Sequence, residues 1–528
     1  MAELAQLRAG VLDIALKFGE GVGRNGEPYA WMLDCRELLL QGDYLQQTCR
    51  ALWDRLKVYE PDYVGGLTLA ANPLTVGILY ESRRDGYPLD ALIIRRTPKE
   101  NGLRRQVEGP QPKPGSRVVL VDDLVNSGDT QRQAISALRP YDCEILAVGV
   151  MVDYERSGAV WLRERGIAVE SLFTLAGLGV AQREPEQKLS LAWTFEGLNA
   201  GEYPAPKSAP VVADESVFVG SDRGFLLCLD RHGQERWRYA VRDQIRGIHA
   251  TPLVHRGRVY AGAYDGYLYC VEANSGELVW ETRPGQWIGS SAAVHEGLDR
   301  LFVGIEFGQA GGSLLALDAS SGQRCWEVNA RDYIHSSPWV EGGTVYVGAN
   351  DGVLRAVEAQ SGRLAWQFET EGAIKAQPVI AGEVCYFGSF DGHLYAVGAG
   401  TGRLLWKRRL SHHLYNTPLV AEGLVIAGGH SERVIALERQ TGRVAWVAAT
   451  AGALVGGFTY DPVRRAVIVG SRDHRIYLFS IDDGSLLAGF ETGFKVLGQP
   501  TLAGSQLLVA SFGDLYSFSI SAIDSMTL

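Results

Sequence analysis

The 528-residue chain has few cysteines, and its seven are scattered without a Cys-x-x-Cys motif or an adjacent pair. The sequence therefore indicates neither a zinc cage nor a disulfide framework, and we expect reduced, mostly buried thiols. No apolar run approaches the ~18 residues that span a bilayer. The first 20 residues have the pattern of an amphipathic helix rather than of a secretory signal. We therefore expect a cytoplasmic protein that does not bind membranes.

Positive charge is also scarce, since 51 Lys and Arg stand against 61 Asp and Glu, for a net charge of -10. This balance argues against a broad basic surface that binds nucleic acid, although a local basic loop can still bind a small phosphate ligand. Hydrophobic residues make up 46% and charged residues 21% of the chain, as in ordinary folded proteins. The length predicts two or more domains.

Glycine, in contrast, is abundant, with 63 residues, and much of it belongs to an internal repeat. Aligned glycines recur every 40 to 44 residues, at Gly220, Gly262, Gly304, Gly348, Gly388, Gly428 and Gly470. This is the period of a four-stranded propeller blade. Asp-Gly and Ser/Thr-Gly turns within the units are typical of successive antiparallel hairpins.

Tryptophan ends most of these units, at Trp237, Trp280, Trp326, Trp366, Trp406 and Trp446, whereas the seventh has Ala488. An eighth unit, residues 506–520, lacks a closing strand of its own. We expect the segment around Trp193 to supply that strand, which closes the ring and removes the open sheet edge. The sequence thus predicts an all-β, eight-bladed propeller over residues 190–528.

Residues 1–180 have a different pattern, in which apolar strands alternate with helical segments. This alternation predicts an α/β domain with a parallel sheet and flanking helices. We expect strands at 63–66, 91–95, 117–121, 145–152 and 169–173, and helices at 44–57, 72–82, 129–138 and 156–165. The polar residues 181–189 are the expected linker to the propeller.

The segment VVLVDDLVNSGDT, residues 118–130, carries the clearest chemical motif. A strand is expected to end at Asp122 and Asp123, before a loop of small polar residues that opens the next helix. Such a helix start offers N–H groups to a phosphate, and paired carboxylates can hold sugar hydroxyls or a hydrated Mg²⁺. The segment predicts a phosphorylated-ribose site; the alternative is a strand that ends in two solvated acids.

This segment resembles the motif of type I phosphoribosyltransferases, which use 5-phosphoribosyl-1-pyrophosphate (PRPP). The resemblance to the orotate phosphoribosyltransferase branch extends over most of residues 12–175. It is carried by ALKFGE at 15–20, Asp34-Cys35-Arg36, PDYVGGLTLAANPL at 61–74 and IRRTPKENGLRRQVEG at 94–109, together with 118–130. It implies the phosphoribosyltransferase fold, Mg²⁺ as cofactor and a homodimer formed through the first domain.

The resemblance also implies a role for each candidate residue. Asp122 and Asp123 would hold the ribose and the metal, and with Lys99 they would be the catalytic residues. The other PRPP contacts would come from a phosphate loop and a mobile basic loop, at Arg95, Arg96, Asn126, Ser127, Gly128, Asp129 and Thr130. Arg24 and Tyr154 would contact the accepting base.

Several residues depart from the family pattern. Tyr154 stands where orotate enzymes have an arginine for the carboxylate of the base, and a neutral phenol cannot replace a bidentate cation. Ala70 and Ala71 replace a Gly-Gly pair, and Asp129 adds a negative charge beside the phosphate site. We therefore expect an accepting base other than orotate.

The repeats resemble those of pyrroloquinoline-quinone-type propellers, found in quinoprotein dehydrogenases and in an outer-membrane assembly lipoprotein. The quinone enzymes use a vicinal cysteine pair that this chain lacks, so we expect no redox role. Four residues are expected at the central channel: His249, His335, Lys375 and Tyr415. The two histidines could bind a metal or simply face channel water.

Two functions follow from these patterns. The first is Mg²⁺-dependent phosphoribosyl transfer from PRPP to a base or related nucleophile, with a propeller that binds an unknown protein or ligand. The second is a catalytically weak sensor of PRPP or nucleotides, whose propeller is an interaction scaffold.

Overall fold

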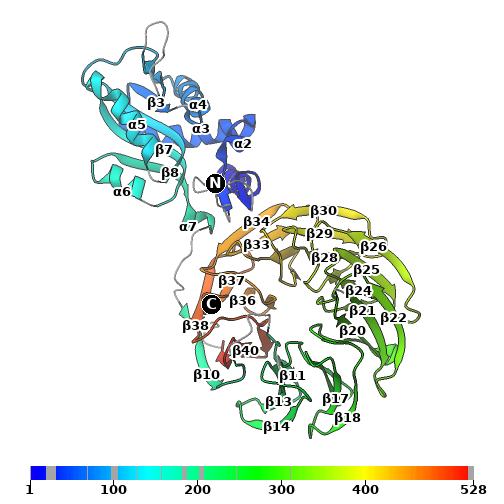
Figure 1. Cartoon of the computed structure of the whole chain (residues 1–528). Helices are drawn as coiled ribbons and strands as arrows, with labels where there is room; N and C mark the ends of the chain where they lie inside the picture. The colour runs from blue at the N-terminus through cyan, green and yellow to red at the C-terminus, as the bar shows by residue number, and fades with distance from the viewer. Residues whose placement is uncertain are drawn as a thin grey trace. The chain divides into compact units, whose positions relative to one another are not determined.

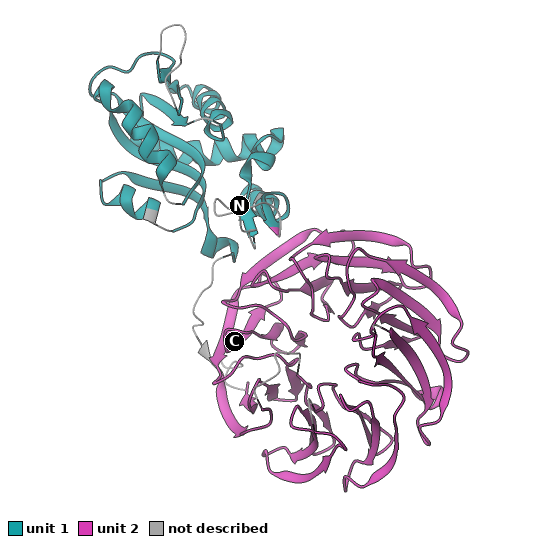
Figure 2. Cartoon of the chain, viewed as in Figure 1, with its two compact units in different colours: residues 1–17, 31–181 teal, residues 18–30, 182–528 magenta. Residues whose placement is uncertain are grey.

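The computed structural model describes residues 2–18, 31–67, 69–96, 105–126, 128–155, 157–180, 187–200, 207–244, 247–309 and 311–520. The chain forms two compact units (Figures 1 and 2). One comprises residues 1–17 and 31–181, and the other residues 18–30 and 182–528. The fold class predicted from the sequence, an α/β domain followed by an eight-bladed propeller, is confirmed.

The first unit is built on a six-stranded sheet of order β5-β4-β3-β6-β7-β8. Its strands are β3 (Tyr63–Leu67), β4 (Asp90–Ile94), β5 (Val107–Glu108), β6 (Arg117–Val125), β7 (Glu144–Asp153) and β8 (Ala168–Thr174). All neighbours are parallel except β5, which runs antiparallel to β4. The β6 strand lies at the centre of the sheet, so its carboxyl end is flanked by the neighbouring strands β3 and β7.

Helices cover both faces of this sheet. They are α1 (Ala2–Gly10), α2 (Cys35–Leu39), α3 (Gly42–Leu56), α4 (Ala71–Arg84), α5 (Asp129–Leu138), α6 (Ser157–Arg163) and α7 (Leu175–Leu178), with short helical turns at Val11–Ala15, Lys57–Tyr59 and Arg139–Tyr141. Val148 and Val150 of β7 pack with α5 and α6. Gly149 between them faces Leu56 of α3. Because strand side chains alternate, α3 lies on the opposite face from α5 and α6.

The N-terminal segment differs from the single amphipathic helix expected for the first 20 residues. The helical backbone ends at Ala15, and β1 (Leu16–Phe18) follows and pairs with β2 (Trp31–Leu33). Leu16 and Phe18 are buried in this arrangement. Pairing with a second strand therefore overrides the helical pattern, as tertiary context commonly does.

The second unit is a ring of eight four-stranded antiparallel sheets around a central axis (Figure 1). Blade one has β11 (Val211–Ala213), β12 (Ser216–Ser221), β13 (Phe225–Asp230) and β14 (Glu235–Ala240), and blade two β15 (Leu253–His255), β16 (Arg258–Gly262), β17 (Leu268–Glu272) and β18 (Leu278–Thr282). Blade three has β19 (Ala293–His295), β20 (Arg300–Phe307), β21 (Gly311–Asp318) and β22 (Arg324–Ala330), and blade four β23 (Trp339–Glu341), β24 (Thr344–Gly348), β25 (Val353–Glu358) and β26 (Leu364–Glu369).

The remaining blades repeat this order from the axis outward. Blade five has β27 (Val379–Ala381), β28 (Val384–Gly388), β29 (His393–Gly398) and β30 (Leu404–Arg409), and blade six β31 (Leu419–Ala421), β32 (Leu424–Ala427), β33 (Arg433–Glu438) and β34 (Val444–Ala449). Blade seven has β35 (Thr459–Asp461), β36 (Ala466–Gly470), β37 (Arg475–Ser480) and β38 (Leu486–Glu491), and blade eight β39 (Thr501–Ala503), β40 (Gln506–Ala510), β41 (Leu515–Ser519) and β10 (Ser190–Phe195). Blade eight thus combines the two ends of the propeller sequence.

The repeated tryptophans join each blade to the next. Trp366 of blade four donates its indole N–H to the carbonyl oxygen of Ala399 in blade five, at 2.8 Å. Its ring lies against Gly402, which has a φ of +66°. The same pairing of a tryptophan with a left-handed glycine recurs at Trp193–Gly233, Trp237–Gly276, Trp280–Gly322, Trp326–Gly362, Trp406–Gly442 and Trp446–Gly484.

The seam between blades seven and eight differs, because Ala488 stands at the tryptophan position. Ala488 is fully buried and pairs with Gln187 of β9 (Gln187–Lys188), which adds a fifth strand outside β38. Leu189, the next residue along the chain, packs in the same apolar cluster as Ala488. A short strand and a leucine therefore cover the edge at this blade.

Candidate functional site

Asp122 and Asp123 lie within β6 and not at its end, because β6 stays paired with β7 as far as Val125. The side chain of Asp122 is buried, and its Oδ2 accepts a hydrogen bond from Nε2 of Gln131 on α5, at 2.9 Å. Its Oδ1 accepts a bond from the backbone N–H of Asp123, at 3.0 Å. The two acids thus stand side by side at the carboxyl half of a central strand.

Burial and the charge of Asp123 raise the pKa of Asp122 well above its usual range. Burial also raises the pKa of Asp123, against the effect of Arg36, whose charge lowers it. In the described part of the chain, no Lys or Arg forms an ion pair with either carboxylate. Asp122 is buried and Asp123 half-buried, and two adjacent carboxylates without an ion-pair partner among the described residues are a donor set that fits a hydrated Mg²⁺.

The loop after β6 leads into α5 through Gly128, which caps the helix at a φ of +81°. A Cβ at Gly128 would come within 2.8 Å of the Cα of Gly158, so the close approach of these two segments requires glycine. Asp129 is exposed and pairs with Arg132 at 3.1 Å, while Thr130 is half-buried. Ser127, part of the predicted phosphate loop, lies outside the described residues.

Tyr154 follows β7 directly, and its backbone N–H donates to the carbonyl oxygen of Val125, at 3.0 Å. This bond places the predicted base contact beside the end of β6. The tyrosine ring lies 6.3 Å from the ring of Trp31, centroid to centroid. Our sequence reasoning missed Trp31, although it stands three residues before the Asp34-Cys35-Arg36 motif. The other predicted base contact, Arg24, lies outside the described residues.

Asp153, buried at the end of β7, helps to fix this turn. Its Oδ2 accepts a bond from Arg163 at 2.9 Å, and its Oδ1 accepts the N–H of Glu155 at 2.7 Å. These bonds hold the backbone on both sides of Tyr154. The backbone that carries Tyr154 is therefore held in place by the hydrogen bonds of Asp153.

The predicted basic segment begins where β4 ends. The backbone N–H of Arg95 donates to the carbonyl oxygen of Gln106 at 2.9 Å. The two ends of the basic segment therefore lie side by side. Nε of Arg95 is buried without a partner, and the charge of Arg96 lowers the pKa of Asp122. Lys99 lies outside the described residues.

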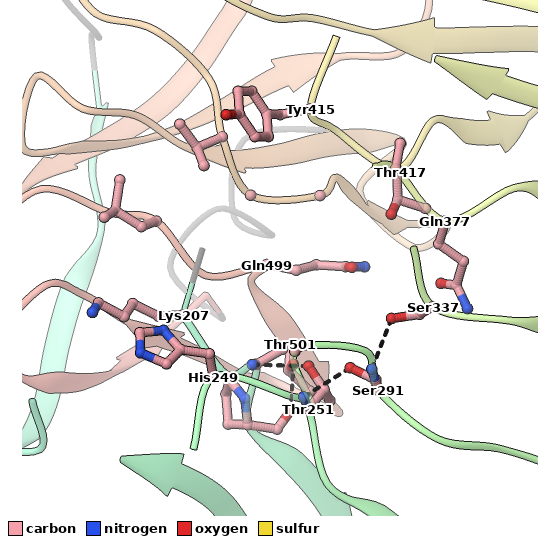
Figure 3. Close-up of a pocket in the computed structure, with 18 of the residues that line it drawn as sticks. Lys207, His249, Thr251, Ser291, Ser337, Gln377, Tyr415, Thr417, Gln499 and Thr501 are labelled. Atoms are coloured by element: carbon pink, nitrogen blue, oxygen red, sulfur yellow. Dashed lines mark hydrogen bonds between the residues drawn. The ribbon is translucent and has the colours of Figure 1, made fainter. Parts of the chain in front are cut away.

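Four residues predicted at the propeller channel line one axial cavity of about 780 Å³: His249, His335, Lys375 and Tyr415 (Figure 3 labels His249 and Tyr415). His335 bonds through Nδ1 to Glu306, at 2.9 Å, and the ring of His249 packs edge-on against Tyr264. The two histidines thus have separate partners. Among the described residues, no group of three His, Cys, Asp or Glu could hold a metal ion.

Sequence reasoning missed three further residues that line this cavity. Tyr264, His430 and Arg472 each stand two positions after the repeat glycine of their blade. That fixed spacing was the signal that could have found them.

In the part of the chain that the structure describes, no helix is long and apolar enough to cross a membrane.

Curated relatives match the N-terminal region. The chain is 34% identical over 156 residues to an orotate phosphoribosyltransferase of Aquifex aeolicus (strain VF5), across 29% of this chain and 84% of that relative. It is 35% identical over 143 residues to an orotate phosphoribosyltransferase of Streptomyces coelicolor, across 27% of this chain and 78% of that relative.

The repeats match the family model described as outer membrane protein assembly factor BamB, over residues 190–294, 264–387 and 352–494. The crystal structure of BamB from Moraxella catarrhalis superposes with a TM-score of 0.52 and 17% identity, covering 63% of this chain and 100% of that one. Quinohemoprotein alcohol dehydrogenase from Comamonas testosteroni gives a TM-score of 0.51 and 15% identity, covering 66% and 79%. At such identities the likeness shows the fold alone.

The chain therefore belongs to the phosphoribosyltransferase family of these orotate enzymes in its N-terminal region, and to the BamB-type repeat family over residues 190–494.

Proposed function

We propose that the first unit transfers phosphoribosyl from PRPP, with Mg²⁺, to a nitrogenous base or related nucleophile other than orotate. The observation that carries the proposal is the pair Asp122 and Asp123, which has no ion-pair partner among the described residues, beside the Gly128-capped start of α5. This pair lies in a domain whose relatives are phosphoribosyltransferases.

Each group in this proposal has a chemical task. Residues 126–130 bind the 5-phosphate at the helix start, and Asp122 with Asp123 holds the ribose hydroxyls and a hydrated Mg²⁺. The metal would offset charge on the pyrophosphate. As the bond from C1 of the ribose to pyrophosphate breaks, the nucleophile forms its bond to C1. Arg95, Arg96 and Lys99 offset the charge of the departing pyrophosphate.

Tyr154 and Trp31 support a flat, uncharged accepting base. Both side chains are aromatic, and their rings lie 6.3 Å apart, so they offer apolar faces and a phenol hydroxyl. A carboxylated base such as orotate needs a cation at this position, and Tyr154 supplies none. We therefore assign base selection to Tyr154, with Arg24 as the second contact that the family resemblance implies.

Exposed apolar side chains support a homodimer formed through the first unit. Leu69, Val76 and Tyr80, at and near α4, are 78%, 59% and 65% exposed. Large apolar residues gathered at one helix are typical of an interface. A second copy of this chain is the partner that the family resemblance implies.

A second function, PRPP or nucleotide sensing without efficient transfer, is favoured by the residues that follow β3. Ala71 is fully buried, and its Cβ fills the space where a Cβ on Gly66 would lie. This packing leaves less room for a pyrophosphate to approach the backbone than a Gly-Gly pair would. In that case the propeller would report the ligand state of the first unit to a partner.

Pyrophosphate release from PRPP, measured with a panel of bases with and without Mg²⁺, separates these functions. We expect release with at least one uncharged base in the wild type, and a loss of about a hundredfold or more in Asp123→Asn. The matched control is Glu164→Gln, since Glu164 is exposed and forms only a 4.0 Å ion pair.

Saturable PRPP binding without release on any base would contradict transfer and support sensing. If PRPP does not bind at all, both functions are wrong. The Lys99→Ala variant adds a test of the basic loop, because its loss of charge should slow release more than it weakens PRPP binding.

A further inference from the structure

We propose that the axial cavity of the propeller binds a small organic anion, a flat-ring compound bearing a carboxylate or a phosphate, between Lys375 and Arg472. The inference rests on the binding role proposed above for the propeller and names the chemistry of its ligand. Both residues line the cavity, Lys375 from blade five and Arg472 from blade seven.

Lys375 and Arg472 are partly buried cations without an anionic partner. Neither side chain forms a hydrogen bond or an ion pair with a described residue. Lys375 instead lies 4.7 Å from the ring centroid of Phe390 and 5.8 Å from that of Tyr415. Partly buried charges gain most from an ionic partner, because water screens them less.

The acids two positions after the repeat glycines of blades one and three are already engaged. Asp222 pairs with Lys207 at 2.8 Å, and both side chains are almost fully buried. Glu306 accepts a bond from His335 at 2.9 Å. Burial lowers the pKa of Lys375, although the charges of Glu306 and Asp332 favour its charged form. Among the described residues that line the cavity there is no Asp or Glu, so the lining offers two cations without an ion-pair partner.

Blade six lies between the two cations and contributes Tyr415 and His430, whose ring centroids are 5.7 Å apart. Nδ1 of His430 is buried without a hydrogen-bond partner. Burial lowers the pKa of His430, which favours the neutral form of its ring. An aromatic face and an unused ring nitrogen between two cations fit a flat ring with an anionic substituent.

The cavity has a suitable size and a fixed wall. Its volume of about 780 Å³ lies within the ~300–1,000 Å³ of small-molecule sites. Hydrogen bonds link neighbouring blades around it: the N–H of Thr251 donates to Oγ of Ser291 at 2.8 Å, and that of Ser291 to Oγ of Ser337 at 3.0 Å (Figure 3). A wall tied in this way is preorganised for a ligand.

Isothermal titration calorimetry of the full chain with benzoate and phenyl phosphate tests the inference and distinguishes the two anions. We expect saturable binding of at least one of them, weakened about tenfold or more in Lys375→Met and in Arg472→Gln. Lys375→Arg should retain binding. Benzyl alcohol and inorganic phosphate, which lack the charge or the ring, should bind more weakly.

Lys407→Met is the matched control, because Lys407 is exposed on β30 of the same blade as Lys375. It should leave phenyl phosphate binding unchanged. Thermal unfolding of each variant verifies its fold. PRPP binding is measured on the same wild-type preparation, so absence of anion binding while PRPP still binds overturns this inference alone. Undiminished binding in both Lys375→Met and Arg472→Gln also overturns it.

Discussion

At the scale of single residues, the two neighbouring acids of β6 are the most unusual feature of the first unit. Folding removes Asp122 from water and places a second carboxylate beside it, and both effects favour the protonated form. A carboxyl group whose pKa is raised by folding stabilises the fold at low pH. That contribution is lost as the pH rises through the folded-state pKa.

Asp123→Asn should therefore stabilise the first unit at neutral pH while it abolishes the proposed activity. The amide removes one of two like charges and can donate to Asp122, so we expect a gain of about 1 kcal/mol at about pH 7.5 that vanishes towards about pH 4. The helical circular dichroism signal during urea unfolding reports this change. If the variant is less stable than the wild type at neutral pH, repulsion between the two carboxylates does not destabilise the fold.

Under the proposed function, Tyr154 selects the accepting base. We expect little orotidylate synthesis by the wild type, and an orotate affinity at least several-fold higher in Tyr154→Arg, because the guanidinium can pair with the carboxylate of orotate. Tyr154→Phe, which adds no charge, is the control. Orotate binding by calorimetry and turnover assays measure both, and robust synthesis by the unmodified protein would show that orotate is accepted.

At the scale of elements, the seam between blades depends on a glycine in each Ser/Thr-Gly turn. Gly402 has a φ of +66°, and a Cβ there would come within 2.6 Å of the Trp366 ring. Both the backbone conformation and the ring contact therefore exclude a side chain. The glycine excess of the sequence reflects this constraint, repeated around the ring.

Gly402→Ala should destabilise the propeller by about 2 kcal/mol, through backbone strain and displacement of the indole. Gly400→Ala, two residues earlier, is the matched control, since a Cβ there meets nothing within 4 Å and the φ is not left-handed. We expect it to change stability by less than about 0.5 kcal/mol. Tryptophan fluorescence during urea unfolding compares the two, and equal effects would refute the seam argument.

At the scale of the whole molecule, the propeller is closed by a strand from the opposite end of its sequence. Ser190–Phe195 of β10 pairs with β41, with Trp193 opposite Ser517. Trp193 then donates to the carbonyl oxygen of Arg231 in blade one, at 2.8 Å. The closing seam thus has the same indole contact as the inner seams, and β41 is paired on both sides, with β10 and with β40.

Trp193 and Trp366 are both half-buried, so Trp193→Ala should cost about 2 kcal/mol, less than the loss of a fully buried tryptophan and about as much as Trp366→Ala at an inner seam. Equal losses are expected because a closed ring has no weak end. Urea unfolding of the full chain measures both variants. If Trp193→Ala unfolds like the wild type while Trp366→Ala is destabilised, the strand does not close the ring in solution.

The architecture could be predicted from the order of the amino acids alone, because the information that specifies it is local. The glycine spacing, the hairpin turns and the recurring tryptophans predict blades wherever they occur. The strand, acid and small-residue order of residues 118–130 likewise predicted a loop at a helix start. Local patterns failed only where pairing extended or replaced an element, as in β6 and at residues 16–18.

The composition of the two sites, in contrast, depends on contacts that form in the folded chain. The burial of Asp122, the contact of Trp31 with Tyr154, and the placement of Lys375 and Arg472 around one cavity depend on residues far apart in the chain. Burial and the charges of distant neighbours set the pKa of a group and decide whether a cation has a partner. Burial and charge contacts of this kind form only when the chain has folded, so they cannot be predicted from the spacing of residues along the sequence.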